Sequence, residues 1–540
     1  MHSTQLEYET SAARWRRAVE THRERPFLTF EIEPGDEQSW SYGEFDEVVA
    51  RTASGMAERG VGPGDVVHLV LPNSVAFVAV WLACARLGAT FSCSDPRATA
   101  AELGAARDRL RPVLAVCGPE QQAAYSAVDT AASVPLIVTT SADPTVGGLA
   151  ADDAVSVERP NTSEPGPADR LAILFTSGTT SAPKGVELTQ ANYALTGDLM
   201  AAGANLSPDH RWLVVLPLFH ANAQYYCFSA AISVGASVAL MPSFSASRFL
   251  DQAVRHEVTH TSLFAAPIRM ILARTSASSE PVALTHAWFA QNLTGEEYQR
   301  ISALLGCRPR QIYGMTETGP AVLMSDPDPA CPESMGRVTP GCEVRLRSLD
   351  GGGAVASGSV GEIQVGGQPG RSLFAGYLDD PVATAASIAE QGENGFVWFA
   401  TGDRAEVDED GNYYFAGRGG DQLKVAGENV SVVEIEQAIA KNGNVFEVAV
   451  VGRPDPTYTE VPVAFVVPRF PHDAAGLAEA VRAWCAEQLA PMKRPHEIHI
   501  VDELPRTSVG KIRKFLLTSG AGNGPATQTV SPILEEGAQT

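Results

Sequence analysis

Residues 171–185 read LAILFTSGTTSAPKG, an apolar run followed by a loop rich in hydroxyl groups. The run 171–175 predicts a buried strand. A phosphate group needs several converging donors, and the loop offers five hydroxyls, at Thr176, Ser177, Thr179, Thr180 and Ser181. Gly178 lets the backbone turn its N–H groups inward, and Lys184 adds a compact positive charge. Composition alone would favour a flexible linker, but the position directly after a strand and the Pro-Lys-Gly ending favour a phosphate-binding loop.

Strands and helices alternate on both sides of this loop. Residues 66–71 predict a buried strand, and residues 74–87 predict an apolar helix that ends at Gly88. The alternation continues to about residue 320, which is typical of βαβ units over a parallel sheet. Residues 335–415 are different, because short apolar runs there alternate with glycine-rich turns.

We therefore predict an α/β fold with two domains and a tail. The large N-terminal domain (1–418) contains βαβ-type sheets and a β-rich subdomain at about 335–415. A small, mobile α+β domain follows at 419–519, since residues 417–427 (GRGGDQLKVAG) have the composition of a hinge. The tail 520–540 lacks apolar periodicity and is expected to be disordered.

The bulk composition restricts the kinds of partner. The formal charge of −23 disfavours nucleic acid and anionic membranes as partners. The chain has no uncharged apolar run of about 18 residues and no apolar signal segment at its start, so we expect no membrane span and no secretion. Its 8 cysteines form no CxxC pair, which predicts reduced thiols in a cytoplasmic protein and no metal cage.

The loop is not a Walker A loop, because it lacks the pattern GxxxxGK[ST]. The Gly-Lys pair at 510–511 does not match that pattern either, because Ile512 follows it. It resembles the signature loop of the adenylate-forming superfamily, which includes acyl-CoA synthetases, nonribosomal peptide adenylation domains and firefly luciferase. That loop usually reads TSGTTGxPKGV, so Ser181 stands where glycine is usual. Serine reduces backbone freedom but keeps a donor, and we expect ATP binding to survive.

A second segment supports this resemblance. Residues 313–318 (YGMTET) resemble the family's second core motif, which comprises Tyr313, Gly314, Met315, Thr316 and Glu317. The resemblance implies that the tyrosine packs on adenine, that the threonine contacts the α-phosphate and that the glutamate holds Mg²⁺. It also implies Thr176 as a second Mg²⁺ ligand and a catalytic residue. Mg²⁺ on ATP prefers such oxygen ligands.

Two further motifs follow in the family's order. Thr401-Gly402-Asp403 resembles the ribose-binding motif, in which the carboxylate accepts from both ribose hydroxyls. Arg418, fifteen residues later, matches the arginine that also reaches the ribose. Residues 505–511 (PRTSVGK) resemble the C-terminal motif, which implies that Lys511 bridges the attacking carboxylate and the α-phosphate. The matches run from about residue 40 to 515, nearly the whole chain.

The resemblance implies two successive reactions. A carboxylate attacks the α-phosphorus of ATP, pyrophosphate leaves, and the C-terminal domain then rotates so that coenzyme A attacks the acyl-adenylate. Gly420 stands at the hinge position, where aspartate or lysine is common. Ala426 stands in the loop beside the pantetheine tunnel, which more often has two glycines.

The acyl pocket is expected after residues 216–220 (LPLFH). His220 is expected to gate the pocket, and packing in the core is the alternative. The other candidate positions are Ala221, Gln224, Ala265 and Gly314, together with Ala290, Gln291 and Asn292, which are also expected at the nucleotide. The alanines indicate room for a bulky acid. Gln224 and Asn292 either bind a substituent or satisfy backbone groups.

Residues 288–298 (WFAQNLTGEEY) and 370–374 (GRSLF) look most like the carnitine/crotonobetaine-CoA ligase branch. Carnitine itself is disfavoured, because the candidate positions offer no carboxylate or aromatic cage for a quaternary ammonium. Ala, Gly, Arg, Val and Pro are favoured over Lys and Asn, which indicates a coding bias. This bias and the roomy pocket resemble ligases of secondary metabolism, such as those that activate polycyclic diterpenoid acids for platencin-type antibiotics.

Two alternatives stay open. One is a stand-alone adenylating enzyme that passes its acyl-adenylate to a carrier protein or to a separate acyltransferase. The other is a non-catalytic nucleotide-binding scaffold. The sequence disfavours this alternative, because it retains the predicted site residues Glu317, Asp403, Arg418 and Lys511. The sequence does not decide the oligomeric state, with a homodimer among the options.

Overall fold

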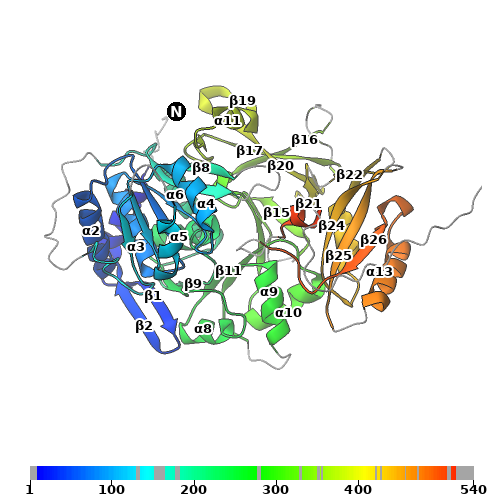
Figure 1. Ribbon diagram of the computed structural model, residues 1–540, viewed down its shortest axis with the longest axis horizontal. Helices are drawn as coiled ribbons and strands as arrows, with labels where there is room; N and C mark the ends of the chain where they lie inside the picture. Colours follow the sequence, from blue (N-terminus) through cyan, green and yellow to red (C-terminus); the bar gives the residue numbers. More distant parts are fainter. Residues whose placement is uncertain are drawn as a thin grey trace, which may run out of the picture. The chain divides into compact units, whose positions relative to one another are not determined.

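The computed structural model describes residues 9–128, 134–150, 164–176, 183–275, 281–326, 331–349, 353, 355, 357–419, 422–425, 428–455, 458–470, 474–506 and 512–518 (Figure 1). The chain forms two compact units. The first comprises Met1–Gly178, Ala182–Arg345 and Gln364–Phe399, and the second comprises Thr179–Ser181, Leu346–Ile363 and Ala400–Thr540. Among the described residues, no helix is long and apolar enough to cross a membrane.

The first sheet of the first unit has the order β18-β8-β7-β4-β3-β5-β6. Its strands are β3 (Val66–Val70), β4 (Thr90–Cys93), β5 (Leu114–Cys117), β6 (Leu136–Val138), β7 (Arg170–Thr176), β8 (Lys184–Thr189) and β18 (Gly376–Tyr377). The strands from β6 to β7 are parallel, while β8 pairs antiparallel with β7 and with β18. The predicted strand at 171–175 is therefore confirmed, but the predicted loop is shorter, because Lys184 and Gly185 belong to β8.

The second sheet of the same unit runs in the order β15-β14-β13-β12-β11-β9-β10-β1-β2. Its strands are β1 (Pro26–Glu33), β2 (Asp36–Ser41), β9 (Arg211–Val214), β10 (Ser237–Leu240), β11 (His260–Phe264), β12 (His286–Ala290), β13 (Arg310–Tyr313), β14 (Leu323–Met324) and β15 (Ser334–Val338). The strands from β13 to β1 are parallel, and the pairs at both ends are antiparallel. This topology confirms the predicted α/β class.

Helices accompany both sheets. They are α1 (Ser11–His22), α2 (Tyr42–Glu58), α3 (Val75–Leu87), α4 (Ala100–Leu110), α5 (Gln122–Ser126), α6 (Gln190–Gly203), α7 (Ala230–Val234), α8 (Phe249–Arg255), α9 (Ala265–Arg274), α10 (Gly295–Leu305) and α11 (Pro381–Ser387). Local chemistry sets their ends: Ser74 caps α3 by accepting from the Phe77 N–H, and Gly88 ends it at φ +68°. In α10, Thr294 and Glu297 form a capping box.

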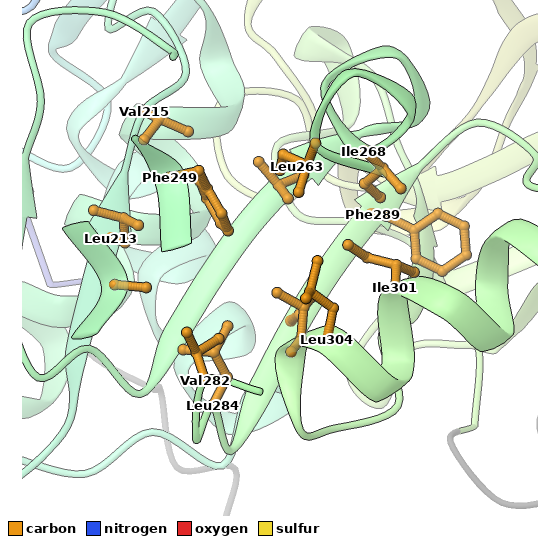
Figure 2. Close-up of a cluster of buried hydrophobic side chains, with 14 of the residues drawn as sticks. Leu213, Val215, Phe249, Leu263, Ile268, Val282, Leu284, Phe289, Ile301 and Leu304 are labelled. Atoms are coloured by element: carbon orange, nitrogen blue, oxygen red, sulfur yellow. The ribbon is translucent and has the colours of Figure 1, made fainter. Parts of the chain in front are cut away.

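One apolar cluster joins the second sheet to three of these helices. Figure 2 shows Leu263 of β11 and Phe289 of β12 among Ile268 of α9 and Ile301 and Leu304 of α10. Leu263, Phe289, Ile268 and Ile301 are at most 1% exposed. The close packing fixes β11 and β12, so that the segments after their carboxyl ends are held in place.

The second unit is α+β. Its sheet has the order β23-β22-β25-β24, with β26 paired to β25, and its helices are α12 (Val432–Ala440), α13 (Ala474–Gln488) and α14 (Lys514–Thr518). The strands of this sheet are β22 (Gln422–Val425), β23 (Glu428–Ser431), β24 (Val445–Asp455), β25 (Thr459–Pro468) and β26 (Glu497–Ile500). The unit also contains β21 (Tyr413–Arg418), which is not part of this sheet. Ile435, Ile439 and Val481 lie in its core.

Three strands have residues in both units: β16 (Glu343–Arg347), β17 (Val360–Gly367) and β20 (Val397–Val407). A short strand, β19 (Ile388–Gln391), pairs with the beginning of β20. The second unit thus includes residues before 418, and the domain boundary at 418–419 stays a prediction. The predicted tail 520–540 lies outside the described residues.

Candidate functional site

The two ends of the predicted phosphate-binding loop lie opposite each other. Thr176 ends β7 and pairs with Lys184, the first residue of β8. The Thr176 hydroxyl lies 3.5 Å from the Lys184 carbonyl oxygen, at the limit of a hydrogen bond. The other predicted donors, Ser177, Gly178, Thr179, Thr180 and Ser181, lie outside the described residues. Their role in phosphate binding stays a prediction.

Lys184 and Glu317 both contact one tyrosine. The Tyr377 hydroxyl donates to Glu317 Oε1 at 3.0 Å, and Lys184 Nζ lies 4.6 Å from the centroid of the Tyr377 ring. Tyr377 is 8% exposed and Glu317 is 4% exposed. The predicted phosphate lysine and the predicted Mg²⁺ ligand thus meet at Tyr377, although they come from distant segments. Tyr377 was not among the site residues predicted from the sequence, because no local pattern indicates its contacts with two distant segments.

The turn after β13 holds Glu317. Tyr313 ends β13, and Thr316–Thr318 forms a single 3₁₀ turn. The Met315 N–H donates to Thr318 Oγ1 at 3.0 Å, which closes the turn. Glycine is favoured at 314, because an added Cβ would lie 3.0 Å from both the Tyr226 hydroxyl and the Pro320 carbonyl oxygen.

Two of the predicted acyl-pocket residues, Gln224 and Asn292, form hydrogen bonds within the protein. Gln224 is fully buried, and its amide accepts from the Tyr193 hydroxyl at 2.6 Å and donates to the Leu218 carbonyl at 2.5 Å. The side-chain amides of Asn292 and Gln311 lie 2.9 Å apart. Gln224 thus satisfies one backbone carbonyl and one hydroxyl, while the Asn292 side chain contacts another side chain. Binding of a substrate substituent by either residue stays a prediction.

The remaining candidates lie at element ends. Ala265 begins α9 and is buried, and Ala290 ends β12. His220 is half-buried with its ring centroid 4.5 Å from that of Phe219, and Ala221 follows it. The gating role of His220 stays a prediction.

Two backbone irregularities accompany these residues and were not evident from sequence. Gln291 has φ +74°, a left-handed conformation that costs a residue other than glycine about 1 kcal/mol or more. Residues Ala223–Ser229 form a π-helix, which is rare and is frequently found at functional sites. Within it the Tyr225 hydroxyl is buried without a hydrogen-bond partner among the described residues. Burial raises the pKa of Tyr225, and the nearby Tyr226 and Glu317 raise it further by a smaller amount.

The predicted ribose-binding residues of the second unit form a cross-strand pair. Asp403 on β20 lies opposite Arg418 on β21, and Arg418 Nε is 3.3 Å from Asp403 Oδ1. The Thr401 hydroxyl donates to the Ile363 carbonyl at 2.8 Å and accepts from the Asp403 N–H at 3.1 Å. Gly402 has φ +74°, which favours glycine at this turn. Asp403 and Arg418, fifteen residues apart in the sequence, are thus in contact on adjacent strands.

Lys511 and Gly420 lie outside the described residues, so their roles as catalytic lysine and hinge stay predictions. The flanks of the lysine segment are described. Arg506 pairs with the buried Glu447 carboxylate and forms a β-bridge with Ile512.

Known proteins share this architecture. The chain matches the family described as AMP-binding enzyme over residues 15–378 and the AMP-binding enzyme C-terminal domain over residues 434–511. It is 32% identical over 512 residues to a crotonobetaine/carnitine–CoA ligase of Salmonella arizonae, covering 93% of this chain and 97% of the relative. A benzoate CoA ligase from Burkholderia xenovorans LB400 superposes with a TM-score of 0.82 at 26% identity, over 94% of this chain and 99% of that one. ATP-bound MatB from Rhodopseudomonas palustris superposes with a TM-score of 0.82 at 25% identity, over 95% and 99%.

Proposed function

Since this chain belongs to the family of AMP-binding enzymes, we propose that it uses ATP to join a carboxylic acid to coenzyme A. In the first step a carboxylate oxygen attacks the α-phosphorus of ATP, which forms an acyl-adenylate and releases pyrophosphate. In the second step the thiolate of coenzyme A attacks the acyl carbon and AMP leaves. The observation that carries the proposal is the meeting of Glu317 and Lys184 at Tyr377.

The residues fit the tasks of the first step. Lys184 would contact the ATP phosphates, Asp403 would accept from the ribose hydroxyls, and Lys511 would neutralise charge at the α-phosphate. Glu317 and Thr176 would hold Mg²⁺, since a carboxylate and a hydroxyl are the oxygen donors that this hard cation prefers. When bound, the ion neutralises phosphate charge and orients the leaving pyrophosphate.

Coenzyme A is the favoured acceptor, because the similar proteins named above include two CoA ligases. The finer proposal is a bulky acid of secondary metabolism, with polycyclic diterpenoid acids as one class. It rests on the small side chains of Ala221, Ala265 and Ala290 at the expected pocket positions.

An acid panel tests the proposal. The panel contains crotonobetaine, carnitine, benzoate, fatty acids and polycyclic diterpenoid acids. It is assayed by exchange of labelled pyrophosphate into ATP and by mass spectrometry of acyl-CoA products. Acid-dependent exchange with thioester formation supports the proposal. Exchange without a thioester indicates a carrier protein or a separate acyltransferase as acceptor, and no exchange with any acid indicates a nucleotide-binding scaffold.

Asp403→Asn is expected to raise the KM for ATP about 10- to 100-fold, because a hydrogen bond to a charged group is worth about 1.5–3 kcal/mol and every 1.4 kcal/mol is tenfold. The variant also weakens the contact with Arg418. Asp410→Asn is the matched control, since Asp410 lies exposed at the turn of the same hairpin. An unchanged KM for ATP in Asp403→Asn, measured in the exchange assay, would contradict the ribose assignment.

A further inference from the structure

Tyr377 contacts two charged residues with different parts of its side chain. Its hydroxyl donates to Glu317 Oε1, while its ring face receives the ammonium of Lys184. A hydrogen bond to a carboxylate and a cation–π contact are both stronger when they are desolvated, and Tyr377 and Glu317 are buried. The two contacts can therefore be removed separately by substitution.

Tyr377 is itself held firmly. Its N–H donates to Thr384 Oγ1 at 2.8 Å, and β18 pairs Tyr377 with Val186 of β8. The ring of Phe374 packs against it at 4.8 Å between centroids. The Phe374 N–H also donates to the Glu317 carbonyl oxygen at 2.8 Å. The segment around Tyr377 thus fixes both the backbone and the carboxylate of Glu317.

This arrangement has an electrostatic reason. An ammonium and a carboxylate in a desolvated site attract each other strongly. If the two groups formed a direct ion pair, neither would be available to bind a ligand. Tyr377 offers each of them a neutral partner instead. We propose that Tyr377 is a positioning residue that keeps Glu317 directed for Mg²⁺ and Lys184 directed for the ATP phosphates. The inference rests on the proposed function for one point, namely that the ligands are Mg²⁺ and the ATP phosphates.

Two variants separate the contacts. Tyr377→Phe removes the hydroxyl but keeps the ring for Lys184, and Tyr377→Leu removes both. Tyr298→Phe is the control, because the Tyr298 hydroxyl donates to the Pro309 carbonyl at 3.0 Å and is not among the candidate site residues. Calorimetric titration with ATP, with and without saturating Mg²⁺, measures the contacts without requiring turnover.

In the wild type, Mg²⁺ is expected to strengthen ATP binding. Tyr377→Phe is expected to reduce this Mg²⁺-dependent gain about tenfold and to change metal-free ATP binding less than about twofold. Tyr377→Leu weakens both, and Tyr298→Phe resembles the wild type. A full Mg²⁺ gain in Tyr377→Phe, or no gain in the wild type, would overturn the inference. Normal Mg²⁺·ATP behaviour without exchange for any acid would leave it standing and overturn the proposed function.

Discussion

Lys511→Ala is expected to lower acyl-adenylate formation about 100- to 1000-fold and to leave thioester formation from supplied acyl-adenylate within about twofold of wild type. A lysine at the α-phosphate stabilises charge that develops only while ATP reacts. In the proposed second step the C-terminal domain is expected to rotate, so that this lysine no longer faces the acyl-adenylate. Pyrophosphate exchange and single-turnover thioester formation measure the two steps separately.

Lys514→Ala is the matched control for this experiment. Lys514 lies three residues further along, and its Nζ pairs with Glu436 Oε1 at 2.8 Å. We expect a modest loss of stability and both half-reactions close to wild type. An equal loss of both half-reactions in Lys511→Ala would contradict the rotating-domain account.

Acid is expected to destabilise the first unit through two buried histidines. Burial, together with Arg107, lowers the pKa of His68 to about 3, and burial lowers the pKa of His260 to about 4. An unfolded histidine has a pKa of about 6.5. The folded state therefore favours the neutral rings, and their contribution is fully present above pH 6.5 or so. It is lost as the pH falls towards the folded values, by about 3 kcal/mol for each ring near pH 4.

His68→Gln tests this prediction. His68 contacts the Tyr125 hydroxyl at 3.1 Å and the Ser94 hydroxyl at 2.9 Å, and glutamine retains a polar group without titrating. Urea unfolding at several pH values is expected to show a shallower acid loss for this variant, even if it is less stable at neutral pH. His496→Gln, at a solvent-exposed histidine, is the control. A slope as steep in His68→Gln as in the wild type would refute the assignment.

Local patterns predicted much of this fold. The strand at 171–175 became β7 (Arg170–Thr176), and the helix at 74–87 became α3 (Val75–Leu87), because apolar runs and capping residues act over short distances. The α/β class and the acid–CoA ligase family also followed from the sequence. In contrast, the inclusion of Lys184 in β8 depends on pairing with β7, which no local pattern encodes.

The candidate site was less predictable where contacts join distant segments. Glu317 and Lys184 belong to separate motifs, and only the pairing of β18 with β8 brings Tyr377 to both. The burial of Gln224 against Tyr193 likewise depends on how α6 packs. The left-handed backbone of Gln291 had no sequence signal, since that conformation is usual for glycine and asparagine but not for glutamine.

The pairing of Thr176 with Lys184 has a consequence for the proposed binding of ATP by the connection between them. The ends of the connection 177–183 are held together by β7 and β8 before any ATP arrives. The loss of chain entropy that accompanies closing a short loop therefore occurs during folding and does not reduce the free energy of binding. A substitution that weakens the β7–β8 pairing would lower ATP affinity without removing a single atom that contacts the nucleotide.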